Sequence, residues 1–363
     1  MKKILPFTLL LVLFSCKKEK TDNNPQPNSN LYFPPNGSSE WASTSPQSMG
    51  WNTSELNNLF NYLQGANSRA FIILKDGKIA VEQYWGQNRT GGAFNQNSSW
   101  QWASAGKTLT AFVVGKAQAE KKLDINQRTS TYLGNGWTSL SSAKEALITV
   151  RHQLSMTTGL DDAVPNSDNT APASLQYKAD AGTRWAYHNA PYTLLQAVVT
   201  NAVGQPFNNY FDAKLKSPIG MDGQWADLGD NHVYFSTPRS AARFGLLMLA
   251  NGVWKGNDVM GDAAYIKQLT TTSQAINPGY GFLWWLNGKD KYMVPQSQIV
   301  FTGALSPDAP ADMFAALGKD GQMICVVPSK NLVVVRMGDG DGPGLVSISM
   351  QNEIWARLKK VIP

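Results

Sequence analysis

The stretch WASAGKTLTAF, residues 102–112, decides how the rest of this sequence is interpreted, because it joins a candidate nucleophile to the start of a helical pattern. Ser104 and Lys107 have the i, i+3 spacing that places two side chains on the same face of a helix. Free backbone N–H groups in the first turn of a helix favour negative charge that develops nearby. The pattern predicts either a serine nucleophile with a lysine base or, more simply, a helix cap followed by a surface lysine.

The Ser-x-x-Lys spacing is weak by itself, because it also begins at Ser15 and at Ser141. Ser15 lies in a leader-like segment, and Ser141 precedes a short polar stretch. Ser104 follows a Trp-rich approach and opens a long helical pattern. A serine hydroxyl becomes an effective nucleophile when a neighbouring base removes its proton. Burial suits Lys107 to that task, since it disfavours the ammonium form and lowers the pKa.

A second element is the segment GTRWAYHNAPYTLL, residues 182–195, which contains Tyr187-x-Asn189. Tyr187 can exchange a proton with Ser104, and Asn189 can hydrogen-bond a substrate carbonyl or hold the lysine. The simpler interpretation is a buried tyrosine before a helix that Asn189 caps. A competing Ser167-Asp168-Asn169 lies in a Pro-flanked polar loop, and we interpret it as a chance match.

The amino terminus predicts processing and anchoring. Two lysines precede an apolar run that ends just before Cys16, a pattern similar to a bacterial lipoprotein signal peptide over residues 1–15. The run is too short to span a bilayer, and lipidation of Cys16 would supply the anchor. The alternative is a plain secretory signal with an incidental cysteine. Residues 16–45 are polar and rich in Pro and Asn, which indicates a flexible tether.

The remaining patterns predict one large α+β unit. A helix begins near Asn52, a hairpin turns at Asp76-Gly77, and helical spacing dominates the middle of the chain. Strands return from Gly281 onward, with Cys325 as a buried inert thiol in one of them, and a helix closes the chain. We therefore expect one sheet built from N- and C-terminal segments, covered by helices, with a helical part inserted. The expected division is an α/β domain of residues 46–123 and 236–363 and a mainly helical domain of residues 124–235.

Taken together, the motifs carry a resemblance to a known family. The chain resembles the serine hydrolases that include class C β-lactamases, penicillin-recognising DD-peptidases, related esterases and 6-aminohexanoate-dimer hydrolases. The resemblance covers about residues 46–360. It implies a β-lactamase/transpeptidase-like α+β fold with an antiparallel sheet and an inserted all-helical domain. The segments that carry it, besides Ser104-x-x-Lys107 and Tyr187-x-Asn189, are ITVRHQLSMTTGL, KLKSPIGM, AARFGLLMLANG, YGFLWW and GKDGQMICVVPSKNLVVV.

The third motif of that family, Lys-Thr-Gly or His-x-Gly, departs from the pattern here. With Gly318 at the glycine position, Ala316 replaces the cation; in a slipped register, Lys319-Asp320-Gly321 fits Lys-x-Gly. We prefer the Gly318 register, and we expect Gly318, Ala316 and Trp185 to line the substrate site. Backbone N–H groups of Ser104 and Lys319 would form the oxyanion hole. The missing cation weakens recognition of the carboxylate that β-lactams and D-Ala-D-Ala peptides present, which favours an esterase or amidase.

Other chemistries find little support in the sequence. The three histidines, His152, His188 and His232, do not form a recognisable Ser-His-Asp or zinc pattern, and we expect neither a metal nor a cofactor. The formal charge of +6 is scattered, which argues against nucleic acid as a partner.

The predicted function is that of a serine hydrolase acting on a small ester, amide or peptide. It would be held at the bacterial envelope by its lipid anchor alone, as a periplasmic or outer-membrane lipoprotein. The alternatives are a β-lactamase or DD-peptidase proper, or a non-catalytic envelope binding protein of the same fold.

Overall fold

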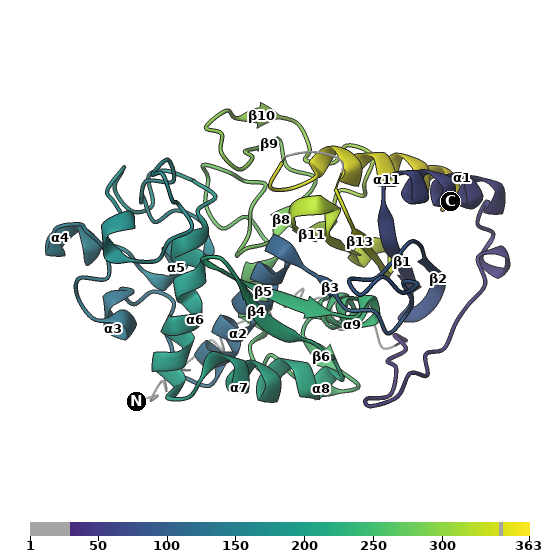
Figure 1. The fold of residues 1–363 in the computed structure, drawn as a ribbon, viewed down its shortest axis with the longest axis horizontal. Helices are drawn as coiled ribbons and strands as arrows, with labels where there is room; N and C mark the ends of the chain where they lie inside the picture. Colours follow the sequence, from purple (N-terminus) through teal and green to yellow (C-terminus); the bar gives the residue numbers. More distant parts are fainter. Residues whose placement is uncertain (1–29, 341–343) are drawn as a thin grey trace, which may run out of the picture.

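A computed structural model describes residues 30–340 and 344–363. Its centre is a six-stranded sheet in which every pair of neighbours is antiparallel. The strands come from both ends of the chain, so the purple and yellow segments meet in the sheet (Figure 1). This confirms the predicted α+β fold. In spatial order the strands are β2 (Lys78–Tyr84), β1 (Ser68–Lys75), β13 (Leu332–Gly338), β12 (Met323–Val327), β11 (Phe314–Leu317) and β8 (Trp285–Leu286).

The β1–β2 hairpin forms at the predicted turn. Asp76 and Gly77 have φ values of 51° and 80°, so both residues are in the left-handed region that a tight two-residue turn requires. Gly77 has a second reason to be glycine, because a Cβ there would lie 1.9 Å from the carbonyl oxygen of Tyr32.

Helices cover both faces of the sheet, and every residue of β13 is buried. The helix α9 (Pro238–Leu249) packs on β13, β12 and β1. Its Gly245 lies so close that a Cβ would be 2.4 Å from Cγ1 of Val333. The terminal helices α1 (Thr53–Gly65) and α11 (Ile348–Val361) pack together, and α1 contacts β1 (Figure 1). Asn52 caps α1, accepting hydrogen bonds from two backbone amides of its first turn.

The inserted part is mostly helical. Its long helix α6 (Asn189–Val203) packs on α2 (Lys107–Ala119), the helix that follows Ser104. It also contains strands β4 (Gln224–Leu228) and β5 (Asn231–Ser236), which join β3 (Trp100–Gln101) in a small sheet, so the predicted helical range ends inside a strand. The domain division itself stays a prediction. The shorter elements are α3 (Ser130–Leu133), α4 (Ser142–Glu145), α5 (Val150–Leu154), α7 (Phe207–Phe211), α8 (Ser217–Ile219), α10 (Ala263–Leu269), β6 (Val253–Trp254), β7 (Asn257–Asp258), β9 (Lys291–Tyr292) and β10 (Phe301–Thr302).

The N-terminal strap, residues 31–44, lies against the body where a flexible tether of residues 16–45 is predicted, and for residues 16–29, outside the described part, the tether stays a prediction. It is bound to the body: Tyr32 N–H donates to Asp76 O at 3.0 Å, and Trp41 Nε1–H donates to Gly77 O at 2.8 Å. The Pro/Asn-rich composition of this segment predicts a solvated chain, but its few apolar residues pack on the body. One of them, Leu31, is buried in the core. Residues 1–29, including Cys16, lie outside the described part. Over the described residues, no helix has the length and apolar character needed to cross a membrane.

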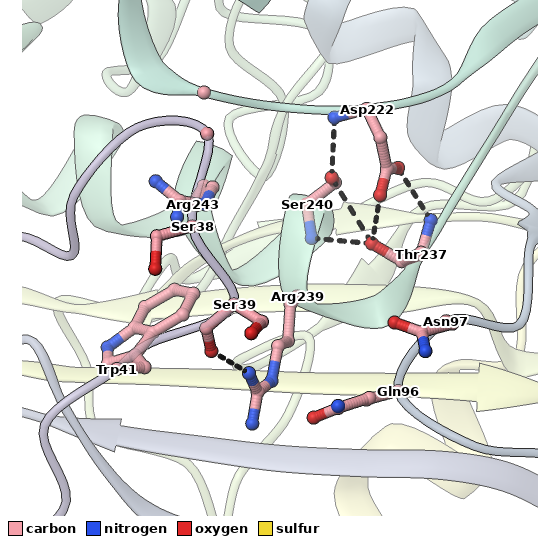
Figure 2. Close-up of a pocket in the computed structure, with 12 residues that line it drawn as sticks. Ser38, Ser39, Trp41, Gln96, Asn97, Asp222, Thr237, Arg239, Ser240 and Arg243 are labelled. Atoms are coloured by element: carbon pink, nitrogen blue, oxygen red, sulfur yellow. Dashed lines mark hydrogen bonds between the residues drawn. The ribbon is translucent and has the colours of Figure 1, made fainter.

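The strap also forms one wall of a polar cavity of about 210 Å³ (Figure 2). Two arginines of α9 reach the strap there. The Arg239 guanidinium donates to Ser39 O at 2.6 Å and forms an ion pair with Glu82. Arg243, which is 5% exposed, donates to Pro35 O at 2.8 Å and to Ile219 O at 2.9 Å. The arginines therefore fasten the strap to the body.

Candidate active site

Ser104 is held at a bend between strand β3 and helix α2. Trp102 fixes the approach, since its backbone N–H donates to Tyr234 O at 2.8 Å and its indole N–H donates to Ser236 Oγ at 2.7 Å. A short 3-10 turn, Ala103–Gly106, then leads into α2. Ala103 has φ 46°, a left-handed conformation that costs of the order of 1–3 kcal/mol for a residue with a Cβ. The strained turn leaves Ser104 half-buried at the start of the helix.

The Lys107 amine lies beside the Ser104 hydroxyl, with Nζ and Oγ 3.0 Å apart. Lys107 is 4% exposed, so it is not the surface lysine of the simpler interpretation. Its Nζ lies 4.4 Å from the ring centre of Tyr192 and 5.2 Å from that of Tyr187. Burial lowers the pKa of Lys107 to about 7, although the charge of Asp168 opposes the shift. A large fraction of the amine is therefore neutral near neutral pH and able to accept a proton.

Tyr187 completes a triangle with these two residues. Tyr187 is 6% exposed, and its phenol lies close enough to the Ser104 side chain to interact with it. Burial raises the pKa of Tyr187 well above 10, and the interaction with Ser104 acts in the opposite direction. The phenol therefore keeps its proton at neutral pH. The structure thus brings the predicted Ser104, Lys107 and Tyr187 together.

Asn189 is the first residue of α6, but it does not cap the helix. The N-cap position belongs to His188, and no side-chain capping bond is made there. Instead, Asn189 Nδ2 donates to Asp168 Oδ1 at 2.8 Å. Asn189 Oδ1 is buried and has no hydrogen-bond partner among the described residues.

Asp168 is the site residue that the sequence interpretation missed. It belongs to Ser167-Asp168-Asn169, which we had interpreted as a chance match, and the fold brings this loop against Asn189. The sequence feature that could have pointed to Asp168 is its place in a loop rich in asparagine, since asparagine amides can donate hydrogen bonds to a carboxylate. Nothing in that pattern shows which loop contacts which helix.

The end of strand β11 runs along the nucleophile turn. A Cβ on Gly318 would lie 2.6 Å from Trp102 O and 3.0 Å from the backbone nitrogen of Ser104. This proximity supports the preferred register of the third motif. The N–H of Gly318 donates to Gln322 O at 2.8 Å, which leaves the next amide, that of Lys319, as the candidate for the oxyanion hole.

Two residues expected to line the substrate site are fully buried. Ala316 lies within β11, with no exposed side-chain surface. Trp185 packs behind Tyr187, with ring centres 6.4 Å apart, and is also fully buried. In this structure Trp185 supports the tyrosine rather than presenting its ring to a substrate. Tyr187 is further stacked on Trp285, with ring centres 5.8 Å apart.

The competing motifs lie elsewhere or make structural contacts. Lys144, of the Ser141 match, forms an ion pair with Asp180 and is largely exposed. His152 belongs to the capping box of α5, which ends at Leu154.

Burial raises the pKa of the Cys325 thiol to about 11, as suits an inert core residue. Within residues 30–340 and 344–363, no cluster of His, Cys, Asp or Glu could hold a metal ion.

Comparison with known proteins gives a consistent picture. The family model described as Beta-lactamase matches residues 56–348. Esterase EstB of Burkholderia gladioli is 25% identical over 175 residues, which cover 41% of this chain and 44% of the esterase. A putative D-alanyl-D-alanine carboxypeptidase of Escherichia coli K12 is 23% identical over 215 residues, 49% of this chain and 48% of that protein. The chain thus spans about half the length of these curated relatives.

Solved structures share the fold over most of their length. A putative beta-lactamase from Bacteroides dorei superposes with a TM-score of 0.67 at 16% identity, covering 86% of this chain and 99% of that one. A putative 6-aminohexanoate-dimer hydrolase from Bacillus anthracis also gives 0.67 at 16% identity, covering 92% and 88%. At such low identity these likenesses establish the architecture, and the reaction has to be argued from the site.

Proposed function

Because the chain belongs to the beta-lactamase family, we propose that it is a serine hydrolase that cleaves an ester or amide bond through an acyl-enzyme on Ser104. The observation that carries the proposal is the 3.0 Å contact between Ser104 Oγ and the amine of Lys107. Burial of the amine supports it, since a pKa of about 7 leaves a large fraction of the base neutral near neutral pH.

The proposed reaction has two halves. In the first, neutral Lys107 accepts the Ser104 proton while Oγ attacks the substrate carbonyl carbon. Tyr187 then gives its proton to the leaving group and takes the Lys107 proton in its place, so that the phenol and the neutral amine are both restored. The bond to the leaving group then breaks, and an ester of Ser104 remains. In the second half, the same groups activate a water molecule, which releases the acid and restores the serine hydroxyl.

Charge on the carbonyl oxygen would be stabilised by backbone amides. The backbone N–H groups of Ser104 and Lys319 are the proposed donors, and each such donor typically contributes about 3 to 4 kcal/mol to transition-state stability. The close approach of Gly318 to Ser104 supports this placement.

The proposed substrates are esters or linear amides rather than β-lactams or D-Ala-D-Ala peptides. In the preferred register of the third motif, Ala316 replaces the cation of the family pattern, and a buried methyl group cannot bind a substrate carboxylate. A relative described as an esterase is consistent with this choice, whereas the carboxypeptidase relative keeps a DD-peptidase as the second candidate. A panel of p-nitrophenyl esters, linear amides, D-amino-acid peptides and a chromogenic cephalosporin ranks these classes directly.

A fluorophosphonate probe tests the nucleophile. We expect labelling of wild-type protein at Ser104, with loss of labelling and of p-nitrophenyl ester turnover in Ser104→Ala. Ser141→Ala is the matched control, because Ser141 belongs to the competing Ser-x-x-Lys and should leave both signals unchanged. Unlabelled wild-type protein that is also inert toward reactive esters would favour the non-catalytic envelope binding protein.

The proposed location is the bacterial envelope, with Cys16 lipidated and membrane contact made through that anchor alone. The support is the sequence pattern of residues 1–16. Cys16→Ser should move the protein from the membrane fraction to the soluble fraction, and an unchanged distribution would contradict the anchor.

A further inference from the structure

We infer that Asp168 is a positioning residue of the active site, one that fixes the orientation of the Asn189 amide and places a negative charge near Lys107. The inference rests on the proposed hydrolase function and deepens it. Asp168 is not proposed to touch substrate; it acts through Asn189 and Lys107.

The geometry fixes the amide orientation. Asp168 Oδ1 accepts from Asn189 Nδ2, and Asp168 Oδ2 accepts from Asn231 Nδ2, both at 2.8 Å. An ionised carboxylate can only accept hydrogen bonds, so the NH₂ group of each asparagine has to face it. A flipped Asn189 would place its amide oxygen against the carboxylate. Asp168 therefore holds Asn189 Oδ1 on the opposite side of the amide group, buried and unpartnered among the described residues.

The loop that carries Asp168 is itself held in place. Asn166 Nδ2 donates to Asp230 at 2.9 Å, and Asn169 Nδ2 donates to the same carboxylate at 3.4 Å. Asp230 and Asn231 lie at the turn between β4 and β5, so the hairpin and the loop are joined by amide–carboxylate bonds at three points. In the described part of the chain, no lysine or arginine forms an ion pair with Asp168, so its charge is not cancelled locally.

The surroundings of Lys107 make Asp168 the relevant charge. The amine lies against the Ser104 hydroxyl and the rings of Tyr187 and Tyr192, and Asp168, held by Asn189, acts on it through its charge. Burial raises the pKa of both tyrosines, so both are neutral at pH 7. Asp168 is the one negatively charged group that acts on the amine, and its charge limits how far burial can lower the pKa of Lys107.

His188 is the other titratable group in this region. It stands between Tyr187 and Asn189 in the sequence, and its side chain is buried. Burial lowers the pKa of His188. The charges of Asp162 and Asp168 oppose this shift, and the charge of Arg184 adds to it. Arg184 is paired with Asp162 at 2.7 Å. His188 is therefore neutral where Lys107 titrates, and it does not contribute a charge.

The test is Asp168→Asn, which keeps the side-chain shape and removes the charge. The acid limb of kcat/KM for a p-nitrophenyl ester should move to lower pH, because the neutral amine persists at lower pH once the stabilising charge is gone. At the plateau, kcat/KM should fall by up to about 100-fold, since Asn189 can then flip out of position. Asp168→Glu keeps the charge and should leave the acid limb close to that of the wild type.

Asp230→Asn is the matched control. It loosens the same loop without changing the partner of Asn189 or the charge near Lys107, so its acid limb should stay in place. An unshifted acid limb in Asp168→Asn, or an equal shift in Asp230→Asn, would overturn the inference.

A direct readout separates this inference from the proposed function. The titration of Lys107 can be followed by NMR of protein labelled with ¹³C-lysine, with the Lys107 signal identified by its loss in Lys107→Met. A lower titration midpoint in Asp168→Asn supports the inference even if no ester is turned over, and an unchanged midpoint refutes it. Full ester turnover in Ser104→Ala would instead contradict the proposed hydrolase.

Discussion

The backbone of Gly318 lies against the peptide of Ser104, so closely that a Cβ on residue 318 would be 3.0 Å from the Ser104 nitrogen and 2.6 Å from Trp102 O. Both neighbours are backbone atoms and cannot rotate away. Gly318→Ala should therefore push the end of β11 away from the nucleophile turn. We expect kcat/KM for ester hydrolysis to fall by about 100-fold with little change in the circular dichroism spectrum.

Gly65→Ala is the control for this substitution. Gly65 ends α1, has open space around its Cβ position and does not have a positive φ. Activity should be unchanged. Equal activity of Gly318→Ala and the wild type would show that the oxyanion site does not depend on this contact.

The pH dependence of activity should reflect Lys107. Its neutral form is the proposed base, so kcat/KM should rise with pH and level off above the pKa of about 7. A pH–rate profile between pH 5 and 9 measures this limb. An activity that stays constant down to pH 5 would argue against Lys107 as the base.

Burial of the Lys107 amine should also lower the free energy of unfolding at pH values where the unfolded chain carries the ammonium. Its pKa is about 7 in the folded chain against an ordinary value of 10.5, so the unfolded chain binds more protons between these two pH values. The free energy of unfolding should therefore increase as pH rises from 7 to 10.5, and decrease as pH falls. Lys107→Met removes this slope and should raise Tm at pH 7 by about 5 °C while abolishing activity. Denaturation scans at several pH values measure both effects.

Tyr187→Phe keeps the stacking on Trp285 and removes the hydroxyl that lies near Ser104. If the phenol shuttles the proton, kcat should fall by at least about 100-fold with little change in Tm. Ser167→Ala tests the competing Ser-Asp-Asn element and should have a small effect. The reverse ranking of the two variants would move the second catalytic element to the loop.

Arg243 should be needed for docking of the N-terminal strap. Arg243→Met leaves the carbonyl groups of Pro35 and Ile219 without their donor, which we expect to cost about 2 kcal/mol. Limited proteolysis should then cut within residues 31–44, and ester turnover of the remaining folded protein should be normal. Lys359→Met is the control, because its side chain is 68% exposed and its 3.5 Å ion pair with Asp308 should contribute little.

The sequence was sufficient where a pattern depends on neighbours along the chain. The β1–β2 turn needs two residues of positive φ, and Asp76-Gly77 provides them. The cap of α1 is one asparagine side chain bonded to amides two and three residues later. The Ser104 and Lys107 contact likewise depends on spacing within one helical turn.

The sequence was insufficient where tertiary contacts decide. The composition of the strap predicts a tether, because the residues that bind it are arginines of α9, about two hundred residues away in the sequence. The position of Asp168 depends on a hydrogen bond from Asn231 at the start of β5, 63 residues further along the chain. Helix α5 ends at Leu154, and two residues later Met156 adopts a φ of 58°, which no right-handed helix can continue.

The pairing of β1 with β13 has a consequence for biosynthesis. Ser68 pairs with Gly338 and Lys75 with Leu332, so the middle of the sheet joins chain segments that leave the ribosome far apart in time. Until nearly the whole polypeptide has emerged, the apolar β1 has β2 as its one neighbour. Contacts of such large sequence separation form slowly, and the nascent chain must be kept from aggregating in the meantime. Truncations that remove β13 should therefore yield insoluble protein rather than a smaller folded unit.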